Sequence, residues 1–272
     1  MTNVPYTHVD AFTATPLAGN QAAVMVLEAW PGDALLQRVG AENMFAETAF
    51  LVRDESGQAD WELRWFTPQV EVRLCGHATL ASGHMLLERD ASLERVTFRT
   101  RGAGVLEVRR DGANGYAMSL PAIATEPGSF PEALAHFGEP APQAVLRHPD
   151  GYAILLYASA GEVCALSPDF KALAALGDEL FICTAPGAGH ASEADVVSRV
   201  FAPGAGIDED PATGSAHAAL TPFWAARLGR AAFTAHQASR RGADFTCRLE
   251  EGRAILGGHC VTVVEGTFRM PD

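Results

Sequence analysis

The sequence has no long apolar run, which limits where the protein can work. Although 48% of its 272 residues are hydrophobic, no stretch approaches the roughly 20 apolar residues that a membrane-spanning helix needs. The segment MTNVPYTHVDAF at the N-terminus has no basic end followed by an apolar stretch, so we expect no signal peptide. The sequence therefore predicts a globular, cytoplasmic protein that does not enter a membrane.

Cysteines are few, and their pattern excludes the usual cysteine-based scaffolds. Their odd number and the lack of any C-x-x-C argue against a disulfide framework and a structural zinc site. His77 and His84 could share a helix face, but no third ligand follows at a suitable spacing, so we expect no metal site. Cys75 and His77 are two residues apart before a predicted helix, and we expect their side chains not to meet. The cysteines are Cys75, Cys164, Cys183, Cys247 and Cys260.

Basic and aromatic residues are also scarce. The formal net charge is −13 and only 8% of the residues are aromatic. Such a surface repels phosphate backbones and offers no stacking stripe for bases, which argues against a nucleic-acid partner. An anionic substrate can still bind where helix N-termini supply a local positive potential.

Short strand-like runs recur, rich in β-branched and aromatic residues and ended by Gly, Pro or Asp. The predicted strands are 6–12, 22–27, 48–52, 61–66, 96–100, 105–110, 116–120, 152–157, 179–184, 196–201, 245–249, 254–256 and 260–264. The predicted helices are 33–39, 79–89, 131–137, 169–176 and 215–228. This alternation predicts a mixed α/β (α+β) chain.

An internal repeat divides the chain into two similar halves. Phe66-Thr67-Pro68 precedes Cys75, and Phe201-Ala202-Pro203 precedes Asp210 at the same spacing, 135 residues later. A proline-rich segment, 121–142, suggests a crossover between the halves. We therefore expect two lobes facing each other, residues 1–118 and 119–272, with a terminal strand that can cross back to the N-terminal lobe.

Each half carries a polar signature that leads into an apolar helix, Leu74–Thr79 in the first and Asp208–Ser215 in the second. Glycine lets the backbone come close to a ligand, and the first N–H groups of a helix can hold a carboxylate. Capping of the helices by Thr79, Thr213 or Ser215 is an equally good interpretation. The sequence leaves both open.

Glu47 lies in the segment Ala46–Phe50, where a carboxylate stands at the entrance of an apolar strand. An exposed glutamate is the ordinary interpretation of this pattern. Burial in a cleft would raise the carboxyl pKa towards neutrality, whereas neighbouring helix N-termini would lower it. The residues alone do not decide which effect is larger.

At these positions the chain resembles the PhzF-like (phenazine biosynthesis-like) family. The similarity spans nearly the whole chain, through the segments 9–13, 19–24, 46–50, 64–68, 75–79, 199–203, 210–216 and 237–242. The resemblance implies a diaminopimelate-epimerase-like fold, with two α/β lobes that each wrap a bent mixed or antiparallel sheet around a central helix. The central helices would be 79–89 and 215–228.

The resemblance also implies a cofactor-independent isomerase that moves a proton, and with it a double bond, in a small unsaturated carboxylic acid. It assigns Glu47 as the base, with Asp210 and His77 hydrogen-bonding the substrate. The substrate-binding residues would be Gly19, Asn20, Cys75, Gly76, Thr79, Gly214 and Ser215. It further implies a homodimer and no metal.

Two departures from the family pattern keep alternatives open. Gln21 stands where the family commonly has proline, which could change only a turn. Cys75 stands where related epimerases keep a catalytic thiol, but Asp210 occupies the matching position in the other lobe. Alternatives are therefore an epimerase or racemase that uses Cys75 with Asp210 or Glu47, and a non-catalytic binding protein of the same fold.

Overall fold

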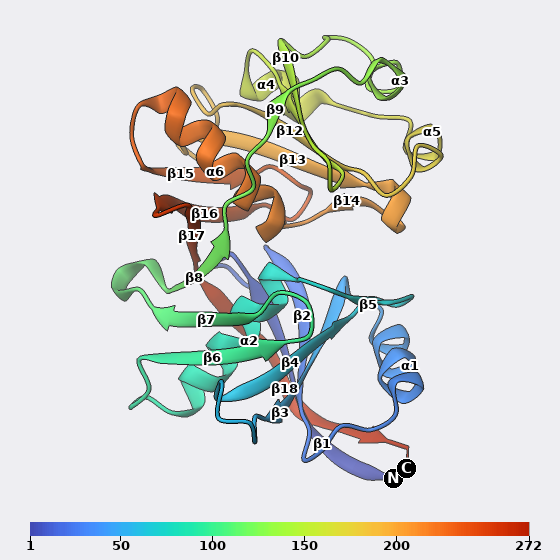
Figure 1. Cartoon of the computed structure of the whole chain (residues 1–272), viewed down its shortest axis with the longest axis vertical. Helices are drawn as coiled ribbons and strands as arrows, with labels where there is room; N and C mark the ends of the chain where they lie inside the picture. Colours follow the sequence, from blue (N-terminus) through green and yellow to red (C-terminus); the bar gives the residue numbers. More distant parts are fainter. Residues whose placement is uncertain (272) are drawn as a thin grey trace. The chain divides into compact units, whose positions relative to one another are not determined.

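The computed structural model describes residues 1–271 and divides into two compact units. The first unit contains Met1–Ser119 together with the C-terminal segment that begins at Gly257, and the second unit contains Leu120–Leu256 (Figure 1). Among the described residues, no helix has both the length and the apolar character needed to cross a bilayer.

The sheet of the first unit is mixed. Strand β1 (Thr2–Ala11) pairs antiparallel with the C-terminal strand β18 (Cys260–Met270) on one side and with β2 (Asn20–Val26) on the other. The remaining strands are β3 (Glu47–Arg53), β4 (Trp61–Phe66), β5 (Glu71–Val72), β6 (Arg95–Thr100), β7 (Val105–Arg110) and β8 (Tyr116–Pro121). Parallel pairs join β2 to β3 and β4 to β6, and antiparallel pairs join β3 to β4, β4 to β5, β6 to β7 and β7 to β8.

Helix α2 (Gly76–Arg89) is the central element of this unit. Every residue from Gly76 to Leu87 is buried, and the helix contacts β1, β2, β3, β6, β7 and β18 (Figure 1). A helix that is covered all round must be rich in apolar or small residues. Gly83 is one of them, because a Cβ there would lie 2.3 Å from Val108 Cγ1 on β7.

The other face of the sheet packs against helix α1 (Asp33–Asn43). Leu36 and Val39 of this helix join a cluster with Phe50 of β3 and Phe66 of β4. The two phenylalanine rings meet edge to face, with centroids 5.6 Å apart. Both faces of the sheet are thus covered, which explains why its strands are apolar on both sides.

The second unit repeats the strand pairing of the first. Its strands are β9 (Glu126–Pro127), β10 (Ala144–His148), β11 (Tyr152–Leu156), β12 (Leu180–Pro186), β13 (Val196–Ala202), β14 (Ile207–Asp210), β15 (Ala232–Gln237), β16 (Ala243–Glu250) and β17 (Arg253–Gly258). Parallel pairs join β11 to β12 and β13 to β15, and antiparallel pairs join β12 to β13, β13 to β14 and β15 to β16. The central helix α6 (Gly214–Leu228) follows β14 as α2 follows β5. The repeat read from the sequence is therefore a repeat of topology.

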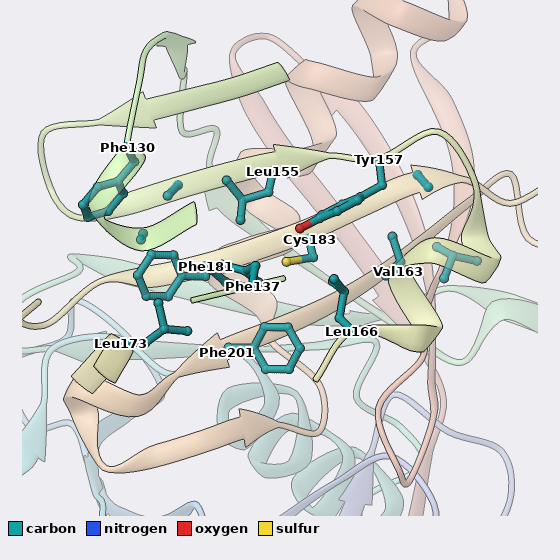
Figure 2. Close-up of a cluster of buried hydrophobic side chains, with 14 of the residues drawn as sticks. Phe130, Phe137, Leu155, Tyr157, Val163, Leu166, Leu173, Phe181, Cys183 and Phe201 are labelled. Carbon is teal, nitrogen blue, oxygen red and sulfur yellow. The ribbon is translucent and has the colours of Figure 1, made fainter. Parts of the chain in front are cut away.

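An aromatic core covers one face of the second sheet (Figure 2). Phe181 of β12 and Phe201 of β13 both contact Phe137, with ring centroids 5.5 and 6.1 Å away. Three short helices contribute to this core: α3 (Pro131–Leu134), α4 (Ala160–Ala165) and α5 (Phe170–Ala174). Phe201 occupies the place in this unit that Phe66 has in the first.

The sequence-based elements need several corrections. Helix α2 begins at Gly76, three residues earlier than predicted, and α1 continues to Asn43. Of the predicted helix 131–137, only Pro131–Leu134 is helical. Phe137, which follows this helix, packs into the core. Strands β5, β9, β10, β14 and β15 and helix α4 were not predicted. In β15 the buried residues Phe233, Ala235 and Gln237 do alternate, but the polar Gln237 obscured the pattern.

Replacing Gly83 with alanine should destabilise the first unit. The added Cβ would press on Val108, and overpacking of this kind costs about 1–3 kcal/mol. Alanine gains up to about 1 kcal/mol in helix propensity, which offsets only part of the clash. Urea unfolding should show the loss, whereas Gly266→Ala, with nothing within 4 Å of its new Cβ, should change stability by less than about 0.5 kcal/mol. An unchanged midpoint for Gly83→Ala would contradict the packing described.

Candidate active site

The predicted site residues fall into two groups. The first unit holds Gly19, Asn20, Glu47, Cys75, Gly76, His77 and Thr79, and the second holds Asp210, Gly214 and Ser215. In the first unit, these residues lie at the starts of strands β2 and β3 and around the start of α2. In the second unit, they lie at the end of β14 and the start of α6. The two groups are described in turn.

Strand register brings Asn20 and Glu47 to the same end of the first sheet. Glu47 is the first residue of β3 and lies opposite Ala22 of β2, two residues after Asn20. Gly19 makes the turn into β2 with a φ of +62°, and a Cβ there would lie 2.2 Å from the Ala11 carbonyl oxygen. Only glycine fits this close approach, so Gly19 fixes where Asn20 stands.

Glu47, His77 and Cys75 form one contact cluster at the start of α2. His77 Nε2 lies 3.2 Å from Glu47 Oε2, and His77 Nδ1 lies 3.5 Å from Cys75 Sγ. The side-chain amide nitrogen of Asn20 lies 3.2 Å from the same Nδ1. An amide can donate or accept a hydrogen bond, so Asn20 can hold the ring in either protonation state.

The expectation that the Cys75 thiol and the His77 imidazole do not meet is wrong. Cys75 is the residue before the first turn of α2 and has an extended backbone, with φ −139° and ψ 111°. A side chain at this position turns back over the first turn of the helix. His77 is the second residue of that turn, so a spacing of two residues places the two groups together.

The pKa values of the thiol and the imidazole in this cluster are both raised, but for different reasons. Burial, followed by the negative charge of Glu47, raises the pKa of Cys75 to about 11. Burial alone would lower the pKa of His77, but Cys75 and Glu47 together raise it well above its ordinary value. At neutral pH the Cys75 thiol is protonated and uncharged, so the contact with Glu47 is what favours the protonated His77 ring there.

Glu47 retains capacity for a further partner. Its side chain is 13% exposed, and among the described residues the buried Oε2 has no partner that meets hydrogen-bond geometry. The contact with His77 is thus an ion pair without good alignment. A carboxylate oxygen held in this way can accept a proton without breaking an existing hydrogen bond.

Neither central helix is capped by a side chain, so the capping interpretation is wrong. The Thr79 hydroxyl donates to the Cys75 carbonyl over 2.6 Å, and Thr213, which directly precedes α6, makes no side-chain cap hydrogen bond. Ser215 hydrogen-bonds Tyr152. The amides at Gly76 and Gly214 thus stand at helix starts that no side chain caps, and such starts attract anions.

In the second unit, Gln237 holds the loop from Asp210 to Thr213. Its Nε2 donates to the Asp210 carbonyl over 2.6 Å and to Thr213 Oγ1 over 3.2 Å. Its Oε1 accepts from the Thr213 amide over 2.9 Å. The Thr213 hydroxyl in turn donates to the Asp210 carboxylate. A fully buried glutamine thereby orients Asp210 through Thr213.

His217 supports the same loop from within α6. Its Nδ1 donates to the Thr213 carbonyl over 2.9 Å, and its ring stacks on Phe245 at 3.7 Å. Burial, and to a smaller extent His236, lowers the pKa of His217 to about 4, although the Thr213 carbonyl acts in the opposite direction. Sequence reasoning gave neither His217 nor Gln237 a role, because both contacts join positions whose spacing carries no chemical signal.

Donor groups do gather at His77, although not through His84. Ligand atoms of Glu47, Cys75 and His77 all lie within 4.8 Å of one another. His84, which lies seven residues further along the helix, contacts Tyr116 and Thr262 through its two ring nitrogens. The third group comes from strand β3, which sequence spacing along α2 could not reveal.

Loss of the Gln237 side chain should loosen the Asp210 loop. Gln237→Ala leaves the Thr213 amide and the Asp210 carbonyl without their partner, which should cost about 2–4 kcal/mol in the free energy of unfolding. In the same variant, hydrogen exchange at the Thr213 backbone amide should become faster. Gln143→Ala, at an exposed position of the same unit, serves as the control. Unchanged exchange at Thr213 in Gln237→Ala would argue against this support.

His217 should make the protein less stable in mild acid. The unfolded chain takes up a proton near the ordinary pKa of about 6.5, whereas the folded chain does so only near 4. Stability should therefore fall as the pH falls from about 6.5 to 4, with about 3 kcal/mol from this group. In His217→Gln, the free energy of unfolding measured with urea should change by about 3 kcal/mol less across this pH range. His259→Gln, at an exposed position, should keep the original slope, and equal slopes in all three proteins would refute the assignment.

Comparison with known proteins identifies the family. The family model described as phenazine biosynthesis-like protein (PhzC-PhzF) matches residues 9–266. A Pseudomonas aeruginosa protein described as an uncharacterised isomerase is 46% identical over 264 residues, which cover 96% of this chain and 97% of that protein. Two further relatives with the same description, from Pseudomonas aeruginosa and Halalkalibacterium halodurans, are 40% and 37% identical.

Similarity to solved structures identifies the fold. A phenazine biosynthesis protein of the PhzF family from Enterococcus faecalis has a TM-score of 0.88 and 37% identity, covering 98% of this chain and 100% of that one. A hydroxyproline epimerase from Agrobacterium vitis has a TM-score of 0.61 and 13% identity, covering 97% and 92%, a likeness that concerns the fold alone. The predicted diaminopimelate-epimerase-like fold is confirmed. The chain belongs to the phenazine biosynthesis-like (PhzC-PhzF) family, and it is an isomerase.

Proposed function

We propose that the protein moves a proton, and with it a double bond, in a small unsaturated carboxylic acid, with Glu47 as the base and without a cofactor. The observation that carries this proposal is the position of the Glu47 carboxylate, 3.2 Å from His77 Nε2 and with a buried oxygen that has no aligned hydrogen-bond partner among the described residues. A general base needs this combination of fixed position and unused acceptor capacity.

In this proposal Glu47 removes a proton from the carbon next to the unsaturated bond and returns it further along the same face of the substrate. His77 holds the carboxylate through their ion pair, and Asn20 holds the imidazole. The protonated His77 ring also brings positive charge close to the negative charge that develops on the substrate.

Cys75 is a poor candidate for the base. Its pKa of about 11 leaves the thiol protonated near neutrality, and a neutral thiol is a weak base. Asp210 is at the position that matches Cys75 in the repeat. Its carboxylate already accepts a hydrogen bond from the Thr213 hydroxyl. These observations favour the proton shift by Glu47 over an epimerase or racemase that uses the thiol.

The substrate carboxylate is assigned to the start of α2. Gly76 precedes His77, and the N-terminal amides of α2 have no side-chain cap, so they offer hydrogen bonds to an anion. In the second unit, the Asp210 carboxylate and the amides of Gly214 and Ser215 are polar groups of the kind that bind an acid. Thr79 contributes by fixing the Cys75 carbonyl, and hence the start of α2.

Replacement of Glu47 should abolish most of the activity. Glu47→Gln keeps the shape of the side chain but cannot accept a proton, so exchange of substrate hydrogen with solvent deuterium should slow by about 10²–10⁴-fold. Proton NMR in deuterium oxide, with a panel of small unsaturated carboxylic acids, measures both the exchange and the position of the double bond.

Glu42→Gln is the matched control, because Glu42 is an exposed glutamate of α1. It should exchange hydrogen at the wild-type rate. Full exchange in Glu47→Gln would refute the proposal. Inversion of a stereocentre without movement of the double bond, lost in Cys75→Ser, would instead establish the epimerase.

A further inference from the structure

We propose that Glu47, Cys75 and His77 also bind a thiophilic divalent cation, Zn²⁺ being the best fit, and that bound cation blocks the base. The inference rests on the proposed function only for its consequence, the loss of activity. The binding itself depends on the donor set and its geometry.

The three donors match what Zn²⁺ accepts. A thiolate, an imidazole nitrogen and a carboxylate oxygen are its three common protein ligands, and sites with three protein ligands keep a fourth position open. At the bond lengths of zinc, tetrahedral donors stand about 3.3–3.6 Å apart. His77 Nε2 lies 3.2 Å from Glu47 Oε2 and 4.0 Å from Cys75 Sγ. The Cys75 sulfur now lies nearer Nδ1, at 3.5 Å, so its side chain must turn toward Nε2 to complete this half of the geometry.

The surroundings favour a bound cation over three separate side chains. Cys75 and His77 are buried, and Glu47 Oε2 has no aligned hydrogen-bond partner among the described residues. A cation bonded to all three would satisfy that oxygen. The partly exposed carboxyl of Glu47 provides the route of entry, since its side chain is 13% exposed.

Binding is a simple exchange of ions. The cation forms a bond to Cys75 Sγ, the S–H bond breaks, and its proton leaves to solvent, as does any proton on His77 Nε2. The Asn20 amide, whose nitrogen now faces His77 Nδ1, must turn over so that its oxygen accepts the Nδ1 hydrogen and orients the ring. No electron changes hands, and the fourth position remains for water or a substrate carboxylate.

Such a cation would act as an inhibitor. The Glu47 oxygen that receives the substrate proton becomes a metal ligand, so its lone pair is no longer available. Activity would then depend on the free concentration of Zn²⁺, and a chelator would restore it. This regulation needs no residue outside the proposed active site.

Cobalt(II) is the probe, because tetrahedral thiolate coordination gives it a near-ultraviolet charge-transfer band together with strong visible absorption. Titration of the purified, metal-free chain should produce both signals, and added Zn²⁺ should remove them. Cys75→Ser should lose the charge-transfer band. Asn20→Ala should weaken cobalt binding by about 10- to 100-fold. Circular dichroism confirms that each variant is folded.

Cys164→Ser and Cys183→Ser are the matched controls, one for an exposed and one for a buried cysteine outside the cluster. Both should keep the full cobalt spectrum. A charge-transfer band that persists in folded Cys75→Ser, or one that never appears in the wild type, would overturn the proposed site.

A separate measurement distinguishes the site from the proposed function. If Zn²⁺ displaces cobalt and stops deuterium exchange, both proposals gain support. If Zn²⁺ displaces cobalt but exchange continues, the cation does not block the base, which overturns the inhibition and argues against Glu47 as the base. A missing spectrum with normal, Glu47-dependent exchange overturns the cation site alone.

Discussion

The ion pair of Glu47 and His77 is the contact on which the account of this protein depends. It joins the first residue of strand β3 to the first turn of the central helix, two elements that are distant in sequence. The pair is held from behind by Asn20, whose position the Gly19 turn determines. Without this contact, Glu47 would be an ordinary carboxylate at a strand end. With it, the carboxylate has a fixed position and keeps an oxygen that can accept a proton.

The two units show how one topology carries two different polar sites. Each has a strand, a short polar loop and a buried helix in the same order. In the first unit, the residue before the helix and the first turn of the helix bring a thiol and an imidazole to the β3 carboxylate. In the second unit, they bring Asp210 to Thr213 and Gln237. The shared fold explains the similar positions, and only the side chains determine the chemistry.

Much of the fold could be predicted because burial leaves a regular pattern. The apolar strands, the two central helices and the repeat of the Phe66 and Phe201 segments all follow from the need to cover both faces of each sheet. Helix starts were less accurate, since Gly76 and Gly214 are poor helix formers that tertiary packing nevertheless places in helices. Strand β15 was missed because its buried end is the polar Gln237.

The site was harder to predict than the fold. Family resemblance named Glu47, His77 and Asp210, but it gave no contact between them. The meeting of Cys75 with His77 depends on the backbone angles at Cys75, and the role of Gln237 depends on strand pairing across the sheet. These are properties of three-dimensional arrangement that local spacing does not carry.

A crystal structure of the Glu47→Gln variant with a small unsaturated carboxylic acid tests the central claim most directly. The account predicts that the acid's reacting carbon lies within reach of residue 47, while its carboxylate accepts hydrogen bonds from the amides at the start of α2. An acid bound away from residue 47, with His77 untouched, would contradict it.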